Sequence, residues 1–105
     1  MVCYWNVKKM QSTILEVNDS RLTINSDGDI EWINLRGYWH RNDGPALVCS
    51  NGDKHWCRHG KLNRFDGPAI EYSNNRRYWF IDDVEYTEMA FKEHPLVVMH
   101  RFVTS

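Results

Sequence analysis

An internal repeat constrains the fold of this chain more than any other feature of its sequence. The segment RNDGPALVCSNGDKHW, from Arg41 to Trp56, recurs 23 positions later as RFDGPAIEYSNNRRYW, from Arg64 to Trp79. A weaker copy, NDSRLTINSDGDIEW, covers residues 18–32 at a spacing of 24. A period in the low twenties is too short for a pair of helices and fits one β-hairpin with its return turn.

Residue pairs that tolerate positive φ angles stand in the middle of each copy, and we expect them to form two-residue type I′ hairpin turns. These pairs are Asp27-Gly28, Asn51-Gly52 and Asn74-Asn75. Between the copies, Asp-Gly-Pro at residues 43–45 and 66–68 indicates a second kind of turn, because proline fixes φ and removes a hydrogen-bond donor. The repeat region, residues 18–86, therefore predicts hairpins near residues 22–35, 46–58 and 69–82.

Two-residue turns would also fix which side chains face each other across each hairpin. The expected pairs are Thr23 with Trp32, Leu47 with Trp56 and Ile70 with Trp79, all on one face of the sheet. We expect this face to form the core and the other, which would carry Val48 opposite His55, to be more mixed. The column of Trp32, Trp56 and Trp79 could alternatively be an aromatic platform on which nucleobases stack.

The sequence changes character after residue 86. Thr87 can cap a short helix over residues 87–94, which Pro95 would end, and the apolar residues that follow predict a final strand or tail over 95–105. STILEV, residues 12–17, predicts a further strand. The expected fold is a single mainly-β domain over residues 1–105, an antiparallel β-meander of three hairpin repeats with a short C-terminal helix.

Composition excludes several classes of function. The net charge is −1, so the chain lacks the field that drives non-specific binding to duplex nucleic acid. Three cysteines (Cys3, Cys49, Cys57) without a C-x-x-C pair indicate free thiols in a reducing compartment, so we expect a cytoplasmic protein. No run of residues has the length and hydropathy of a signal peptide or membrane span, which argues against a membrane partner.

The middle of the chain is locally basic and supplies the candidate binding residues. They are Arg36, Tyr38, Trp39, His40, Arg41, His55, Arg58, His59 and Arg64. Arginine presents a planar fork that suits phosphate or carboxylate, but Arg41 and Arg64 could equally pair with the aspartates of their own turns and tie the hairpins together. On that structural alternative the residues that hold the repeat are Asp43, Gly44, Pro45, Asp66, Gly67 and Pro68, together with the three tryptophans.

Metal binding and catalysis have weak support. His55, Cys57 and His59 alternate in one predicted strand, but a structural zinc site needs four ligands, usually in closely spaced pairs. The sequence contains no nucleophile elbow, no phosphate-binding loop and no paired-carboxylate signature. We therefore expect no metal, no cofactor and no enzymatic activity.

HRNDGPA and NRFDGPA, with the following Asn-Gly and Trp, make the chain resemble the H-R-x-D-G-P-A (MORN-like) repeat proteins of tailed phages and giant viruses. The resemblance covers residues 18–86, and YWFIDDVEYTEMAF is similar to the segment that closes such proteins. It implies an antiparallel β-meander and a viral source, and it implies no enzyme activity. The Tyr-x-Gly-x-Trp opening of the MORN consensus is missing, so lipid binding is not implied.

The function that we expect is a non-enzymatic, virus-encoded module that binds a protein of the host cell, of the accessory or anti-defence type, in the host cytoplasm. Self-association through a sheet edge would also satisfy the unpaired backbone groups that a meander leaves at its edges. The alternative is a small-ligand binder that sequesters a nucleotide signal through the basic middle region.

Overall fold

The computed structural model describes residues 16–17 and 20–104. An antiparallel sheet runs in the order β1-β2-β3-β4-β5-β8-β9-β10, and β6 and β7 form a separate pair. The strands are β1 (Glu16–Val17), β2 (Ser20–Ile24), β3 (Ile30–Ile33), β4 (Leu47–Val48), β5 (Lys54–His55), β6 (Cys57–Arg58), β7 (Lys61–Leu62), β8 (Ile70–Glu71), β9 (Arg77–Ile81) and β10 (Val84–Tyr86). Helices α1 (Glu88–Glu93) and α2 (Pro95–Thr104) follow.

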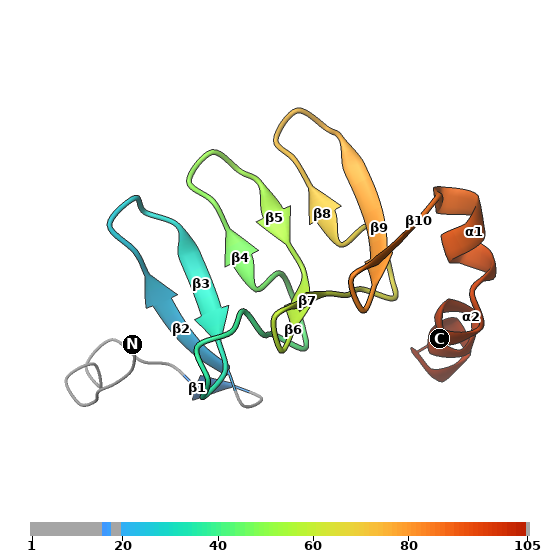
Figure 1. Ribbon diagram of the computed structural model, residues 1–105, viewed down its shortest axis with the longest axis horizontal. Helices are drawn as coiled ribbons and strands as arrows, with labels where there is room; N and C mark the ends of the chain where they lie inside the picture. The colour runs from blue at the N-terminus through green and yellow to red at the C-terminus, as the bar shows by residue number, and fades with distance from the viewer. Residues whose placement is uncertain (1–15, 18–19, 105) are drawn as a thin grey trace.

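The predicted fold class, a mainly antiparallel β-structure with a short C-terminal helix, is confirmed. Figure 1 shows the hairpins β2–β3, β4–β5 and β8–β9 side by side. Their tips all point the same way, and the two helices lie beyond β10. The predicted N-terminal strand lies outside the described residues except for Glu16 and Val17, and so do Cys3 and residues 18–19.

The hairpin tips stand where the sequence predicts them, but each loop is one residue longer than expected. In the first tip, the Gly28 N–H donates to the Asn25 carbonyl (3.0 Å) and the Asn25 N–H donates to the Asp29 carbonyl (3.0 Å). Gly28 has a φ of +85°. The same bonds close the tips at residues 49–53 and 72–76. This is the three-residue hairpin loop that ends in a left-handed residue, and not the two-residue type I′ turn.

The extra loop residue shifts the register by one position, so the predicted cross-strand pairs are wrong. Leu22, not Thr23, lies opposite Trp32. His55 lies opposite Leu47, and Tyr78 lies opposite Ile70. Val48 pairs with Lys54 instead of His55. Because side chains alternate between the faces of a strand, this shift puts Leu47 and Ile70 on the face of His55 and Tyr78 and the tryptophans on the other face.

Aspartate side chains tie each hairpin tip to the next. Asp29 Oδ1 accepts a hydrogen bond from the Ser50 N–H (2.8 Å), and Asp53 Oδ1 accepts one from the Ser73 N–H (2.7 Å). The bond from Ser73 is the main reason why the pKa of Asp53 lies below its usual value. Arg76 occupies the corresponding position in the third hairpin, so the ladder of carboxylates ends there.

In the described part of the chain, two clusters of buried apolar residues pack together, and Leu47 and Ile70 are buried on the other face of the sheet. Trp32, which is 8% exposed, packs with Ala46 and Cys57 in the first cluster. The second cluster joins the end of the sheet to the helices and consists of Ile81, Phe91 and Val97, with Phe65, Trp79 and Tyr86 against it. Trp56 is only partly buried. The three tryptophans therefore do not fill equivalent sites in one continuous core.

The C-terminal residues form two helices, and the strand or tail predicted for residues 95–105 is wrong over the described part. Thr87 caps α1 as expected, because its Oγ1 accepts a hydrogen bond from the Ala90 N–H (3.1 Å). Pro95 ends α1 but is also the first residue of α2, a position where its fixed φ suits a helix and its missing N–H costs nothing. The burial of Val97 against the second cluster outweighs the β-propensity of the valines.

Trp32 and Trp56 should differ in their effect on stability. Trp32→Ala removes a buried ring and should cost about 3–5 kcal/mol. Trp56→Ala should cost roughly 2 kcal/mol, because part of its ring is already exposed to water. Urea unfolding followed by circular dichroism measures both losses. Equal losses in the two variants would contradict the division of the core described above.

Candidate functional site

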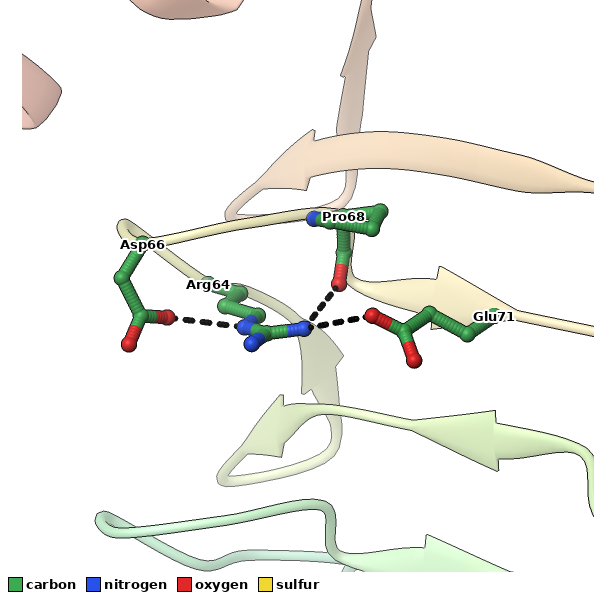
Figure 2. Close-up of polar contacts among 4 residues, drawn as sticks. All are labelled: Arg64, Asp66, Pro68 and Glu71. Carbon is green, nitrogen blue, oxygen red and sulfur yellow. Dashed lines mark hydrogen bonds and ion pairs between the residues drawn. The ribbon is translucent and has the colours of Figure 1, made fainter.

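The arginine of each Arg-x-Asp-Gly-Pro segment is engaged within its own turn. Arg64 donates from Nε to Asp66 Oδ1 (2.7 Å), and from Nη1 to the Pro68 carbonyl (3.0 Å) and to Glu71 Oε2 (3.0 Å), as Figure 2 shows. Its guanidinium also lies over the ring of Trp56, with 3.8 Å between Cζ and the ring centroid. The side chain thus joins its own turn to the preceding hairpin.

Arg41 has the same arrangement one repeat earlier. Its Nε donates to Asp43 Oδ1 (3.1 Å), its Nη1 to the Pro45 carbonyl (3.3 Å), and its Cζ lies 4.4 Å from the ring centroid of Trp32. The pairing within the turn that the sequence offered as the alternative to anion binding is therefore present at both arginines.

The glycines of these turns leave room for the guanidinium, which packs directly against the backbone. A Cβ at Gly44 would lie 2.8 Å from Arg41 Cζ, and a Cβ at Gly67 would lie 2.8 Å from Arg64 Cζ. A side chain at either position would force the guanidinium to shift. The Arg-x-Asp-Gly-Pro segment is thus a device for stacking hairpins, and most of its hydrogen-bonding capacity is used internally.

A groove of about 510 Å³ lies between these two turns and α2. Arg58 lines it, is exposed, and forms no ion pair with the other residues that the structure describes. The rings of Phe65 and His100, with centroids 5.7 Å apart, also line the groove. The remaining lining residues are Arg41, Asn42, Asp43, Gly44, Pro45, Trp56, Asn63, Arg64 and Asp66.

His40 lies in the interior and is only 1% exposed. Its Nδ1 accepts a hydrogen bond from the His59 N–H (2.9 Å), so the ring carries its proton on Nε2 when it is neutral. The ring stacks on that of His59 with 3.9 Å between centroids. One repeat later, Asn63 Oδ1 accepts the equivalent bond from the Asp82 N–H (3.1 Å). His40 therefore supports a turn and is not part of a binding surface.

A second hollow, of about 440 Å³, lies at the loop of residues 34–38. Asn34, Leu35, Arg36, Tyr38 and His59 line it. Asn34 Oδ1 accepts hydrogen bonds from the Arg36 N–H (2.9 Å) and the Tyr38 N–H (3.0 Å), and Asn34 Nδ2 lies 3.0 Å from His59 Nδ1. These bonds hold the loop in one conformation. Leu35 is nevertheless 91% exposed.

The remaining aromatic candidates lie on another surface. The Trp39 ring lies 6.3 Å from that of His55, and His55 lies 6.1 Å from Tyr72, which is 5.8 Å from Tyr78. This row lies on the same face as the buried Leu47 and Ile70. Burial lowers the pKa of His55, and the charge of Asp53 opposes the shift in part.

The structure thus divides the predicted binding residues among separate places. Arg36, Tyr38 and His59 share the hollow, Arg41, Arg58 and Arg64 share the groove, and Trp39 and His55 lie in the aromatic row. Sequence reasoning missed Asn34 and Leu35. The available signal was the spacing of Asn34 and Gly37, which repeats that of Asn25 and Gly28 in the first hairpin tip.

The three residues weighed as zinc ligands are not gathered around one point. Cys57 is buried in the first core cluster, and burial raises the pKa of its thiol to about 12. His55 belongs to the aromatic row and His59 stacks on His40. Over residues 16–17 and 20–104, no group of three His, Cys, Asp or Glu side chains is placed to hold a metal ion.

Comparison with protein-family models, with curated protein sequences and with solved structures gives no match. A functional proposal for this chain therefore depends on its own residues and their geometry. Neither helix in the described part of the chain has the length and hydropathy needed to cross a membrane.

The lowered pKa of His55 predicts a pH dependence of stability. Because the folded-state pKa lies below the unfolded value of 6.5, the unfolded chain takes up a proton first as the pH falls. The contribution of neutral His55 is complete above 6.5 and is lost as the pH falls toward the folded-state pKa. His55→Phe keeps the ring and removes this titration. Urea unfolding at high and low pH should therefore show a smaller loss of stability in the variant, and an unchanged loss would refute the assignment.

Proposed function

We propose that this chain is a non-enzymatic protein-binding module that engages its partner through the hollow of Asn34, Leu35, Arg36, Tyr38 and His59. The observation that carries the proposal is the exposed Leu35 on a loop whose backbone is held by Asn34. A large apolar side chain displayed on an ordered loop contributes nothing visible to folding. Tyr38, which is 52% exposed, lies beside Leu35, and contiguous exposed apolar side chains are typical of surfaces that become buried on association.

The composition of the hollow fits a protein partner. Tyrosine and arginine are the residues that most often dominate the free energy of protein association, and here Tyr38 and Arg36 lie beside Leu35. An ordered loop also loses little conformational entropy on binding, which lowers the cost of association. The partner segment that suits these residues has an apolar side chain for Leu35 and Tyr38 and a carboxylate for Arg36.

The resemblance to H-R-x-D-G-P-A repeat proteins supports a more specific version of this proposal. On that version, the chain is virus-encoded, acts in the host cytoplasm and binds a host protein as an accessory or anti-defence factor. Arg41 and Arg64 pair with the aspartates of their own turns and are therefore assigned no part in binding the partner.

Substitutions in the hollow should abolish binding without affecting the fold. We expect a host protein retained by the wild-type chain to be lost with Leu35→Asp and with Arg36→Glu. Ile24→Asp, which alters another exposed apolar residue, is the matched control and should retain the partner. Calorimetry with the purified partner should show at least a tenfold weaker affinity for Leu35→Asp, about 1.4 kcal/mol. A partner that binds all three variants equally would exclude the hollow.

A nucleotide bound in the groove is the second candidate, because Arg58 is exposed there beside aromatic rings. A nucleotide at a hundredfold excess over its Kd should stabilise the folded state by about 2.7 kcal/mol, which raises Tm by several degrees. Arg58→Ala should remove this shift and Arg36→Ala should keep it. A thermal-shift screen with no stabilising nucleotide would eliminate this candidate.

A further inference from the structure

Helix α2 carries an uncharged face that is largely exposed to solvent. Val97 is buried against the second core cluster, which fixes the side of the helix that packs inward. Leu96, Met99, Phe102 and Val103 are between 47% and 78% exposed. We refer to these four residues as the α2 stripe.

Helical geometry places the α2 stripe on one continuous surface. At about 100° per residue, its four side chains fall within a sector of roughly 120° on the side of the helix away from Val97. No charged residue of α2 falls in this sector. Arg101 lies outside it, and its Nη2 donates to the Lys92 carbonyl at the end of α1 (2.8 Å). A surface helix normally places charged or polar residues on the side away from the core.

The exposed area of the α2 stripe suits a contact with a second, identical stripe. Its exposed side-chain area is on the order of 500 Å², at the upper end of what a monomer usually leaves in one patch. Two such stripes facing each other would bury about 1,000 Å², the lower limit for a specific interface between two proteins. Association through this surface alone would therefore be weak and dependent on concentration.

The charges around the α2 stripe argue against a membrane surface or a charged protein as the partner that covers it. A helix that lies on a membrane surface usually carries several lysines or arginines beside its apolar face, whereas Arg101 is the only lysine or arginine in α2 and it bonds back to α1. A charged partner would find no opposite charge within the stripe. An identical uncharged stripe meets no such mismatch.

We propose that the α2 stripe is covered by the α2 stripe of a second copy of this chain, in an antiparallel pair around a two-fold axis near Met99. A two-fold axis makes the same surface serve both copies, so the contact closes at a dimer. The antiparallel arrangement also sets the positive end of each helix dipole beside the negative end of its partner. None of the residues of the stripe lines the hollow or the groove.

Sedimentation velocity of the full chain over a range of concentrations tests this contact. The wild-type chain should shift from monomer to dimer as the concentration rises through the micromolar range. Met99→Glu and Phe102→Glu should each weaken the dimer at least tenfold, and circular dichroism should show unchanged helix content, because both side chains are exposed. Leu35→Asp is the matched control, and it should remain dimeric even though it disables the hollow.

Crosslinking at residue 99 tests whether the two-fold axis of the dimer lies near Met99. Met99→Cys should give a covalent dimer with a short bismaleimide linker, while the wild-type chain and Leu35→Cys should give far less. A chain that stays monomeric at all concentrations would overturn the proposal. A dimer that survives both glutamate substitutions would place the interface elsewhere, such as at a sheet edge.

Discussion

The stacking of the hairpins depends on an arginine guanidinium held between two repeats. Arg64 bonds to the aspartate and the proline carbonyl of its own turn, and its flat face lies on the tryptophan of the preceding hairpin. Arg41 does the same one repeat earlier. This polar link adds to the burial of Ala46, Leu47 and Cys57, the apolar residues that the middle hairpin contributes to the interior.

The sequence predicts the hairpins well because their signals are local. A glycine or asparagine with positive φ is required at each tip, and the pairs at 27–28, 51–52 and 74–75 mark those places. The register of the strands is harder to predict from the sequence than the position of the tips. It depends on the length of the loop, and the same three-residue loop forms whether Asn25, Cys49 or Tyr72 stands before it. Residue types alone do not distinguish the two loops, and the difference reverses both faces of the sheet.

The candidate site was less predictable than the fold. Composition brings Arg36, Arg41, His55 and His59 together as one basic region, but the pleat and the turns direct them to different surfaces. The buried position of His40 depends on a bond to a backbone group 19 residues away, which no local pattern reveals. Leu35 is the opposite case, since an exposed leucine in a loop looks ordinary in a sequence until the loop is seen to be fixed.

The carboxylate ladder at the hairpin tips gives the array a direction. Each later tip donates a hydrogen bond to a carboxylate of the repeat before it, from the Ser50 N–H to Asp29 and from the Ser73 N–H to Asp53, and Arg76 offers no carboxylate to a further repeat. A copy of residues 41–63 inserted after residue 63 would renew both the carboxylate and the tryptophan that the following unit needs. A copy of residues 64–86 would not. The chain can therefore lengthen by duplication of its middle unit, whereas its last unit works only as a terminus.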